Sequence, residues 1–595
     1  MHIALIYPPN AYSNMPYLAP ALLKGYLHEH SGHTAHTVDL NAEYRAYIRS
    51  EKYVGDFSSI PLGRAGELLR DLVSHQGQAS FESLRDIRTY DQWDDVRVHS
   101  AVLSEVQTLV DRTDQVLLAE QSSSATGLTR QIDDHARLSH GYFIQEQVSG
   151  GLVDESDAVG ITIAYMEQML PSLVLARCIK QRSPHKPVIV GGGAVTHLLE
   201  RLTKDAKFYD LIDYVVPYEG EYSLVEVLDH LDNSSSPPAS NVVSRDNAGK
   251  VVYRRDLLSR PKVHPVPDFS DLRPDLYPTP SPIFPILTSK GCYWGKCAFC
   301  THHEGYGQGY YRMTDETVQN AIKAATQADG DHFYFVDEAI PPRQFTMLAQ
   351  EFLAYRNNGL SPVWMAEARL EPSMVKEQVV SVLEQSGCVL LVNGIESGCQ
   401  AVVDRMHKGV DLELVSRFAE LCSKSDSIRT GWMFFVGFPG ESLEQAQQTF
   451  RYIEHNSEQI DYVSIGAFGL ERGSPIWNDP ARYGITKIHG QGDPSLVLFD
   501  YEMADGTSGG RAKNEELLRS LWAEHRGLRP LADSAVDRAF AMFRPARRAK
   551  SQKSDPSLNI SWPSAAGTQT RYIPHKRRFE VVRDVSISQS VRAPA

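Results

Sequence analysis

The stretch GCYWGKCAFC, residues 291–300, places three cysteines within nine positions: Cys292, Cys297 and Cys300. It follows directly after the strand-like run FPILTS at residues 284–289. Thiolates this close together on one loop cannot all pair as disulfides, whereas three of them can hold three corners of a four-iron, four-sulfur cluster and leave the fourth iron open. An open iron can bind and reduce a substrate. This loop therefore decides the chemistry and, by its place after a strand, where the site lies in the fold.

Structural zinc is the main alternative for the same cysteines. Zinc prefers four protein ligands, commonly supplied by two separated cysteine pairs, so a triplet without a fourth cysteine nearby fits that arrangement poorly. His302 and His303 follow the triplet and can complete such a site, which keeps the alternative open. The ligand rules favour the cluster over zinc, and both over buried cysteines without a metal.

The composition describes an ordinary globular protein of several domains. The chain has 595 residues, of which 42% are hydrophobic and 23% charged, with a formal net charge of -14. This length predicts about three or four domains. The acidic balance argues against nucleic acid as the main partner, because phosphate neutralisation needs clustered Lys and Arg. The one basic stretch, residues 544–553, is short and is interpreted as a solvated tail.

The remaining cysteines and the first residues bear on the cellular compartment. Seven cysteines without paired spacing suit a reducing compartment. The N-terminal sequence lacks the basic start and apolar core of a signal peptide, and no run approaches the ~18 apolar residues of a membrane span. We therefore expect a cytoplasmic protein without a membrane partner. Four cysteines lie in apolar or helical contexts and are interpreted as small core residues: Cys178, Cys388, Cys399 and Cys422.

The first part of the chain alternates strand and helix patterns, which predicts a doubly wound, Rossmann-like α/β domain over residues 1–233. Polar, helix-favouring sequence interrupts the alternation at about residues 42–150, and we interpret it as a mostly helical insertion. The last strand leads into the motif PYEGE at residues 217–221. The candidate strands are residues 2–7, a run ending at 39–41, 158–163, 187–190 and 213–216.

A second alternation follows an interval rich in Pro, Ser and Asp at residues 234–282, which is interpreted as a linker. Six β-α units are too few for an eight-stranded barrel, so residues 283–477 are expected to form an open, partial (β/α)6 barrel. Barrel sites lie at the C-terminal ends of the strands, where the cysteine loop falls. Residues 478–595 are expected to form a mixed region, mainly helical and ending in a tail. The six candidate strands are residues 284–288, 332–336, 363–368, 389–393, 430–436 and 462–467.

Taken together, these features resemble the radical S-adenosylmethionine (SAM) enzymes that carry an N-terminal cobalamin (B12)-binding domain. The resemblance covers about residues 1–475 and depends on several motifs in order. It implies that Cys292, Cys297 and Cys300 bind the cluster, and that SAM chelates the open iron through its amino and carboxylate groups. Reduction of the cluster then cleaves SAM to a 5′-deoxyadenosyl radical. The resemblance further implies an electron donor such as flavodoxin or ferredoxin.

The cysteine spacing departs from the commonest pattern of these enzymes. Four residues separate Cys292 from Cys297, where three are usual. The ligand count is unchanged. Gly295 lies in this gap and can relax the loop, because glycine tolerates backbone angles closed to other residues.

Motifs next to the cluster loop and at the second and third barrel strands match SAM contacts by this resemblance. Phe299 matches the aromatic residue that packs beside adenine. Asp337 and Glu338 match the acidic segment that receives the SAM amino group, since an ammonium group there needs a carboxylate. A solvent-facing strand end is the alternative for this pair. Arg369 is matched to the SAM carboxylate, and a structural salt bridge explains it equally well.

Two later strand ends complete the implied SAM site. Glu396 and Ser397 resemble the segment that contacts the ribose hydroxyls and the methionine moiety. The alternative is a helix N-terminus capped by Ser397. Gly437 and Pro439 match the Gly-x-Pro segment that lets the backbone approach adenine, and an ordinary strand-to-helix turn is the alternative.

The N-terminal domain resembles the cobalamin module through residues at its strand ends. These are Pro8, Tyr165, Gln168, Gly191, Gly192 and Gly193. Bare backbone at strand ends permits close approach to a corrin ring or its nucleotide tail, although a plain turn also explains the glycine triplet. The chain lacks the Asp-x-His-x-x-Gly motif by which many cobalamin proteins supply a histidine to cobalt. Some relatives keep this domain without binding cobalamin.

The leading hypothesis is cobalamin-dependent methylation of an unactivated carbon in the biosynthesis of natural products or peptides. A radical rearrangement, epimerisation or oxidation without methyl transfer is the second hypothesis, and a non-catalytic metal-binding protein is the third. No general acid or base can be identified. Five residues just beyond the cysteines are candidates to face a small-molecule or peptide substrate, with surface positions as the alternative: His302, His303, Glu304, Tyr306 and Tyr310.

Overall fold

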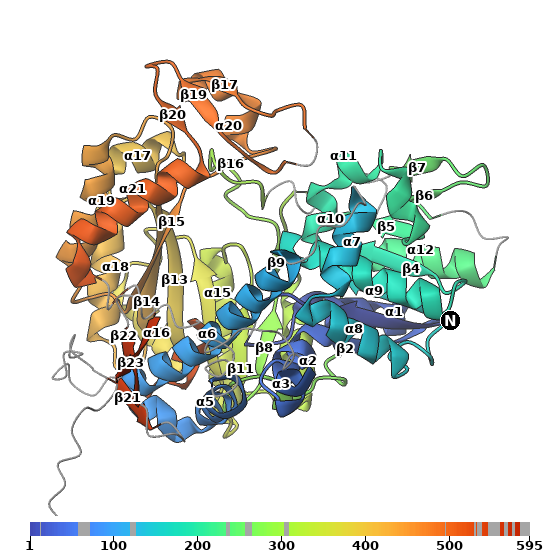
Figure 1. The fold of residues 1–595 in the computed structure, drawn as a ribbon. Helices are drawn as coiled ribbons and strands as arrows, with labels where there is room; N and C mark the ends of the chain where they lie inside the picture. The colour runs from blue at the N-terminus through green and yellow to red at the C-terminus, as the bar shows by residue number, and fades with distance from the viewer. Residues whose placement is uncertain are drawn as a thin grey trace, which may run out of the picture.

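Two parallel sheets, one in each half of the chain, form the framework of the computed structural model (Figure 1). Among the residues described, no helix is both long and apolar enough to cross a membrane. The structure describes residues 1–11, 14–56, 72–119, 127–233, 239–255, 265–302, 309–493, 496–528, 531, 538–545, 560–563, 569–573 and 578–582.

The N-terminal sheet has seven strands in the order β2-β1-β3-β4-β5-β6-β7. The first five run parallel, which confirms the doubly wound arrangement. The strands are β1 (His2–Tyr7), β2 (Thr34–Asp39), β3 (Ala158–Thr162), β4 (Val188–Gly191), β5 (Tyr214–Val216), β6 (Val242–Arg245) and β7 (Val251–Arg254). The helices that follow strands are α1 (Leu18–His30), α9 (Met169–Arg182), α10 (Gly193–His197), α11 (Leu199–Leu202) and α12 (Glu221–Asp232).

The interval 234–282 was predicted to be a linker, and this is wrong for part of it. Strands β6 and β7 form an antiparallel hairpin that extends the N-terminal sheet beyond β5. The turn between them is closed by the Asp246 carboxylate, which accepts hydrogen bonds from the backbone N–H groups of Ala248 and Lys250, each at 2.9 Å. Each strand has only four residues, so its alternation is too short to stand out among the surrounding polar residues.

The described part of residues 42–150 is helical, and its longest helix belongs to both halves of the molecule. The first half of α6 packs Val96 and Leu103 with the barrel strands, and its second half packs Val106 and Val110 in the N-terminal core. Figure 1 shows α6 running across both halves. The helical elements are α2 (Leu40–Tyr47), α3 (Glu51–Asp56), η1 (Leu72–Gly77), α5 (Gln78–Arg85), η2 (Ile87–Asp91), α6 (Trp93–Ala119), α7 (Leu128–Ala136) and α8 (Ser139–Ser149).

The second sheet is the predicted open barrel of six parallel strands, in the order β15-β14-β13-β12-β11-β8. All six strand predictions are confirmed. The strands are β8 (Ile283–Ile286), β11 (His332–Phe335), β12 (Val363–Ala368), β13 (Cys388–Glu396), β14 (Arg429–Val436) and β15 (Tyr462–Ala467). The helices are α14 (Asp315–Gln327), α15 (Pro342–Asn357), α16 (Glu377–Gln385), α17 (Gln400–Arg405), α18 (Leu412–Lys424) and α19 (Leu443–Asn456).

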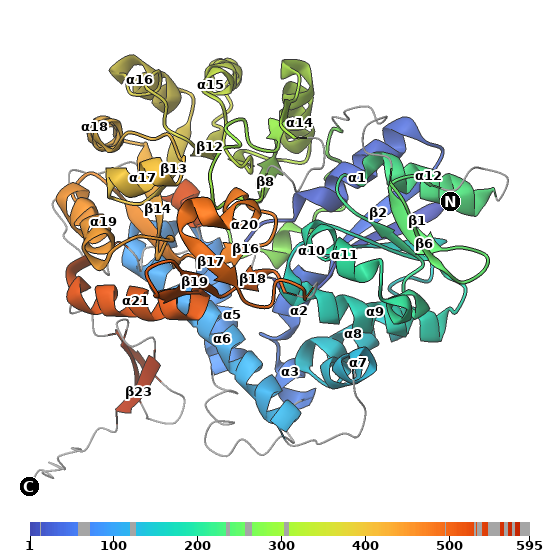
Figure 2. The ribbon, with the colours of Figure 1, turned by 90° about the horizontal axis from the view of Figure 1, so that it is seen from above.

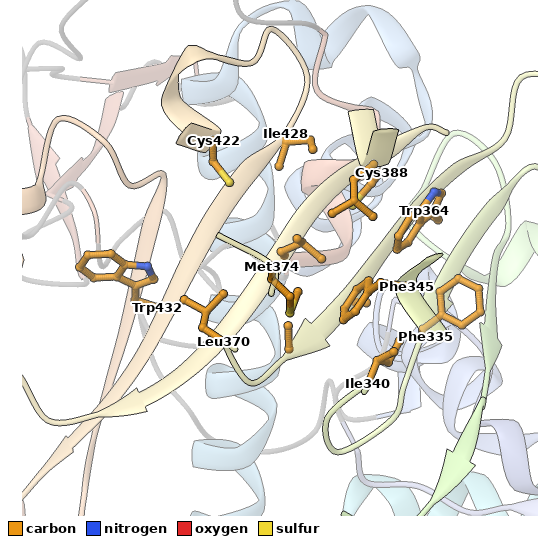
Figure 3. Close-up of a cluster of buried hydrophobic side chains, with 14 of the residues drawn as sticks. Phe335, Ile340, Phe345, Trp364, Leu370, Met374, Cys388, Cys422, Ile428 and Trp432 are labelled. Atoms are coloured by element: carbon orange, nitrogen blue, oxygen red, sulfur yellow. The ribbon is translucent and has the colours of Figure 1, made fainter. Parts of the chain in front are cut away.

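Alternate strand residues face opposite sides of the barrel sheet, as the two-residue period of a strand requires. On the helix-covered side, the Trp364 ring lies 5.8 Å from Phe335 and 6.3 Å from Phe345, centroid to centroid. Figure 3 shows these rings in one apolar layer with Cys388 and Cys422. Both thiols are free and buried, and so are those of Cys178 and Cys399, which confirms the interpretation of all four as core residues.

The inner side of the barrel sheet is covered by segments from both ends of the chain. Leu84, Tyr90 and Val96 from the helical insertion pack in one cluster with Tyr334 and Met365. The same cluster contains residues 539–543, from η8 (Arg538–Phe543). These segments therefore cover the inner side of the barrel sheet around Tyr334 and Met365.

The region after the barrel contains short antiparallel strands as well as helices, as the prediction of a mixed region expects. We call residues 470–509 the cap, because it lies between the two halves when the molecule is seen from above (Figure 2). In the cap, Val497 packs against the N-terminal core, and Glu471 Oε1 lies 4.0 Å from His197 Nε2 of α10. The elements are β16 (Leu470–Glu471), α20 (Pro475–Asn478), β17 (Ile485–Ile488), β18 (Leu498–Phe499), β19 (Tyr501–Met503), β20 (Ser508–Gly509), α21 (Arg511–Glu524), β21 (Ile560–Pro563), β22 (Gln569–Ile573) and β23 (Arg578–Val582).

Candidate active site

The cysteine loop begins at β9 (Ser289–Lys290), directly after β8, and its base is closed by β10 (Tyr311–Arg312), which pairs antiparallel with β9. Ala298 anchors the middle of the loop. Its N–H donates to the Met406 carbonyl at 2.8 Å, and its carbonyl accepts from the N–H of Ile476 in the cap at 2.9 Å. The loop is thus held to the barrel on one side and to the cap on the other.

The four-residue gap between the first two cysteines is built around Trp294. Its indole N–H donates to the His407 carbonyl at 2.8 Å, and the Arg369 guanidinium lies 3.7 Å from its ring centroid. A Cβ added to Gly409 would lie 2.3 Å from the Trp294 ring, so this glycine is required by close packing. Gly295 has φ +58°, as the prediction of a relaxed loop expects. The four-residue gap thus contains a tryptophan that is held against Arg369 and the 407–409 segment.

The three loop cysteines are free and half-buried. Burial, together with the charges of Cys297 and Cys292, raises the pKa of Cys300 to about 12. The donor set fits a cluster, since three adjacent thiolates need a cationic partner and each ligates a different iron. Among the described residues, no three His, Cys, Asp or Glu side chains converge on one point in a way that could hold a metal ion. His303, named for the zinc alternative, and the candidates Glu304 and Tyr306 lie outside the described residues.

Asp337 and Glu338 have different surroundings. Asp337 is buried, and its carboxylate accepts hydrogen bonds from Thr288 N at 2.9 Å, Thr288 Oγ1 at 2.8 Å and Ser289 Oγ at 2.6 Å. It ties the end of β11 to the start of the cysteine loop. Glu338 is partly exposed, and its Oε1 lies 3.0 Å from His302 Nδ1. Glu338 is therefore the accessible carboxylate of the pair.

Arg369 is engaged within the protein. It pairs with Glu371 and donates to the carbonyls of Lys408 at 3.1 Å and Gly409 at 2.5 Å, in addition to stacking on Trp294. These contacts match the structural salt bridge given above as its alternative. The guanidinium holds the 408–409 segment and the cysteine loop together.

Lys408 is a cation near the cysteine loop that the sequence did not single out. It is largely buried, and its Nζ lies 2.7 Å from Glu396 Oε1. Burial lowers its pKa, but the charges of Glu396 and Cys297 outweigh this and raise the pKa above the ordinary value. The only signal in the sequence is a lone lysine before Gly409, which is too weak to identify a site.

Glu396 and Ser397 mark an irregular end of β13. Glu396 has φ +75°, and the register between β13 and β14 shifts at this point. A left-handed conformation is costly for a residue with a Cβ and is typical of functional sites. Ser397 is fully buried, and its Oγ accepts from Cys399 N at 3.1 Å before α17 begins. Ser397 therefore closes a turn ahead of α17, whose N-cap position is Cys399, so the capping alternative is wrong, and Glu396 is the residue in the left-handed conformation.

Gly437 and Pro439 form the turn after β14. Gly437 has φ +89°, and a Cβ there would lie 2.2 Å from the Asn514 side chain, so only glycine fits. The Gly437 N–H donates to Glu441 Oε2 at 2.6 Å. Burial raises the pKa of Glu441 to about 7. On the preceding strand, Phe435 meets Phe299 of the cysteine loop at 5.0 Å between ring centroids.

The predicted cobalamin residues shape the strand ends of the N-terminal sheet. Gln168 is fully buried, accepts from the N–H groups of Ala164 at 3.0 Å and Tyr165 at 3.1 Å, and donates to the Pro8 carbonyl at 2.7 Å. It therefore joins the end of β1 to the turn after β3. Tyr165 is 51% exposed and remains accessible.

The glycine triplet follows β4 and packs closely on the same turn. Gly192 has φ +110°, and a Cβ there would lie 2.4 Å from the Ile163 carbonyl oxygen. Gly193 is exposed and lies against the Ala164 carbonyl, next to Tyr165. This exposed edge of backbone and one aromatic ring fits a flat ligand such as a corrin. Gly191 ends β4 and is half-buried.

Tyr17 lies beside the predicted cobalamin face. Its ring stacks on Tyr7 at 4.7 Å and meets Tyr165 edge-on at 6.4 Å. Burial raises the pKa of Tyr17, and the charges of Tyr165 and Glu338 raise it further. Tyr17 therefore lies beside Tyr165 on the N-terminal side, and the helix that follows it packs Leu18, Ala21 and Leu22 with the barrel core. No sequence signal distinguished Tyr17.

Residues 286–453 match the family described as "Radical SAM superfamily". The fold and the site are therefore of the radical SAM class. Residues 286–453 are thus a radical SAM domain, the protein is an enzyme whose cofactors include a four-iron, four-sulfur cluster and SAM, and the non-catalytic hypothesis is wrong.

Three relatives are similar to this chain in sequence: two are named methyltransferases and one is named a cyclase. An uncharacterized methyltransferase of Pyrococcus horikoshii is 25% identical over 327 residues, 54% of this chain and 69% of the relative. The bacteriochlorophyllide d C-12(1)-methyltransferase of Chlorobaculum tepidum is 27% identical over 36% of this chain and 47% of its own length. The anaerobic magnesium-protoporphyrin IX monomethyl ester cyclase of Rubrivivax gelatinosus is 22% identical over 46% of this chain and 49% of its own length.

Two solved structures share the fold. The radical SAM methyltransferase TsrM from Kitasatospora setae, with cobalamin and a [4Fe-4S] cluster bound, matches with a TM-score of 0.53 at 14% identity, covering 88% of each chain. The cobalamin-dependent enzyme OxsB, with aqua-cobalamin and SAM bound, matches with a TM-score of 0.51 at 13% identity, covering 87% of this chain and 66% of OxsB. The predicted fold class is confirmed.

Proposed function

We propose that this enzyme transfers a methyl group from SAM to an unactivated carbon of a small molecule or peptide, with cobalamin as the carrier. The observation that carries the proposal is the joining of the cysteine loop to the strand ends of the N-terminal sheet, where Lys290 Nζ lies 2.9 Å from Glu219 Oε1 and 2.6 Å from Glu221 Oε1. Methyl transfer requires such proximity, because the methyl donor and its carrier must approach each other. The methyltransferase names of two relatives and the folds of TsrM and OxsB support it.

On the barrel side, Cys292, Cys297 and Cys300 hold the cluster. Glu338 accepts the amino group of SAM, because Asp337 is already saturated by hydrogen bonds. Lys408 is the cation that we assign to the carboxylate of SAM, and it would keep its pair with Glu396 at 2.7 Å, while Arg369 holds the 408–409 segment through its carbonyl groups. When bound, the cluster supplies the electron that cleaves SAM, and cobalamin supplies methyl carriage.

On the N-terminal side, Tyr165 and the backbone of residues 191–193, of which Gly193 is exposed, contact cobalamin. Gln168 and Pro8 contribute by fixing the turns that present Tyr165. The cap joins both halves through Val497 and the Glu471–His197 pair. This position suits the cap to exclude water from the reacting groups.

The test is anaerobic reconstitution with iron and sulfide, followed by incubation with SAM, a reductant and hydroxocobalamin. We expect an absorption band near about 400 nm from thiolate-ligated iron, together with methylcobalamin and S-adenosylhomocysteine. A Cys297→Ala variant is the control and should form neither product. A zinc-loaded protein without this band would refute the proposal.

The cyclase relative favours a second candidate function, a radical reaction without methyl transfer. In that case the same incubation yields 5′-deoxyadenosine but neither methylcobalamin nor S-adenosylhomocysteine. For either function, we propose a cytoplasmic enzyme that receives its electron from a flavodoxin or ferredoxin.

A further inference from the structure

A buried ion cluster connects the PYEGE motif with the base of the cysteine loop. Lys290, two residues before Cys292, is only 4% exposed. Its Nζ lies 2.6 Å from Glu221 Oε1 and 2.9 Å from Glu219 Oε1. The Glu221 and Glu219 carboxylates are 7% and 16% exposed; Glu219 lies in the turn after β5 of the N-terminal domain, and Glu221 is the first residue of α12. One buried lysine therefore bridges the two halves of the molecule.

The same carboxylates also hold the strand that closes the loop. Tyr311 of β10 pairs with Lys290 of β9 in the antiparallel ladder, and its hydroxyl donates to Glu219. On the opposite side, the neighbouring Ser289 donates to Asp337 of the barrel at 2.6 Å. Both strands at the base of the cysteine loop thus bond to the N-terminal domain, β9 through Lys290 and β10 through Tyr311. Strand β9 also bonds to the barrel, through Ser289.

Because these charges are buried, separating them is costly. Removing one partner of a buried ion pair leaves the other charge uncompensated in a medium of low polarity, which is strongly unfavourable. Movement of the cysteine loop away from residues 219–221 would separate Lys290 from both carboxylates at once. The position of the loop relative to the N-terminal sheet is therefore tightly specified.

We propose that Lys290, Glu219 and Glu221 form an interdomain clamp, which positions the cysteine loop so that SAM on the barrel side reaches the cobalamin face. These three are positioning residues, since they act through the loop. The methyl-transfer part of this inference rests on the proposed function, whereas the mechanical part does not.

The test compares Lys290→Met with a matched control, Asp271→Asn. The control disturbs Lys24, which is also 4% exposed and has its Nζ 2.7 Å from Asp271 Oδ2 and 3.5 Å from Asp268 Oδ1. That pair joins α1 to the segment before β8. Both variants weaken a buried lysine–carboxylate cluster, but only the first touches the cysteine loop.

The first readout is hydrogen exchange in the reconstituted full chain. In Lys290→Met, the amides of residues 289–293 and 309–312 should exchange at least about tenfold faster, because their local opening no longer separates a buried ion pair. In Asp271→Asn they should exchange at the wild-type rate.

The charge swap Lys290→Glu with Glu221→Lys keeps the net charge and should restore slow exchange. If Lys290→Met does not fold, Glu219→Gln replaces it as the test variant. It keeps the Lys290–Glu221 pair, so exchange of the same amides should accelerate less.

The second readout separates positioning from mere stability. Per mole of cluster, the rate at which Lys290→Met forms 5′-deoxyadenosine should stay within about threefold of wild type. Its rate of cobalamin methylation should fall at least about tenfold, because misalignment affects transfer between two sites more than chemistry at one site. If the wild-type chain does not methylate cobalamin, the proposed function fails and hydrogen exchange alone decides the clamp. Unchanged exchange at the loop in the clamp variants, or equal acceleration in the control, would overturn the inference.

Discussion

The barrel side and the N-terminal side of the site differ in charge. The residues brought together on the barrel side are ionic: Asp337, Glu338, Arg369, Glu396 and Lys408. The residues predicted to meet cobalamin are neutral, and they consist of tyrosines, a buried glutamine and bare glycine backbone.

This contrast shows how one chain can receive two very different ligands. A zwitterionic ligand such as SAM needs paired charges beside its metal, and these are strong when shielded from water. A flat ring needs an aromatic contact and backbone that allows close approach. Substitutions should therefore have large effects on the barrel side and small effects on stability on the N-terminal side.

The largest effect is expected for Cys297→Ala. The loss of one thiolate removes a direct ligand, so SAM cleavage should fall by more than about 100-fold, the upper range for loss of an outer-shell partner. Formation of 5′-deoxyadenosine per mole of chain measures this. Cys388→Ser is the control, since Cys388 is buried in the helix-covered core and remote from the loop sequence. Cleavage retained in Cys297→Ala would refute the ligand assignment.

Lys408→Met should cost both stability and SAM binding. The substitution leaves the Glu396 carboxylate largely buried without its cation at 2.7 Å, and breaking such a pair costs about 3–5 kcal/mol of unfolding free energy. Urea unfolding measures the loss. The double variant Lys408→Met with Glu396→Gln should recover part of it, and no recovery would mean that the pair is not coupled.

Glu441 is expected to make stability depend on pH. Its pKa in the folded chain is raised to about 7 by burial, above the unfolded value of about 4.3. The folded state therefore binds this proton more tightly, and the stability linked to it is complete below about pH 4.3 and is lost as pH rises through 7. The loss should be about 1–3 kcal/mol.

Glu441→Gln should flatten that part of the profile, since its amide oxygen can still accept from Gly437 N. Urea unfolding of both proteins at about pH 5 and pH 8 provides the comparison. An equal decline in the variant would assign the pH dependence to other groups.

Tyr165→Ala should have the smallest effect on stability. The side chain is 51% exposed, so unfolding free energy should change by less than about 0.5 kcal/mol. Cobalamin binding, followed by absorption of the bound cofactor, should nevertheless weaken. Unchanged cobalamin affinity would remove Tyr165 from the N-terminal face.

Strand positions and the cysteine loop could be predicted from sequence because each depends on local patterns. Apolar strand runs and their spacing revealed all six barrel strands, and Gly295 was correctly identified as a relaxed position. The hairpin of β6 and β7 was missed because four-residue strands give too little alternation.

Which charged residue faces the ligand could not be predicted in the same way. Asp337 and Glu338 are adjacent and chemically alike in sequence, yet Asp337 is saturated by Thr288 and Ser289 and Glu338 is not. Arg369 likewise lies at a suitable strand end but is engaged by carbonyls from residues about 40 positions away. Such partners come from tertiary packing, which the order of residue types does not reveal. The contacts of all these residues with SAM stay predictions.

The inner side of the barrel sheet is covered by segments that are distant from it in sequence, and this affects how the chain folds during synthesis. The apolar residues of this side, among them Tyr334 and Met365, are covered by residues 84–96 and 539–543. A ribosome that has made only the six strands has therefore not yet made part of their cover, and contacts this distant in sequence form slowly. We expect nascent chains stalled before residue 538 to be sensitive to protease in the barrel and longer chains to be resistant. The barrel strands should therefore gain this cover only once residues 538–543 have been made.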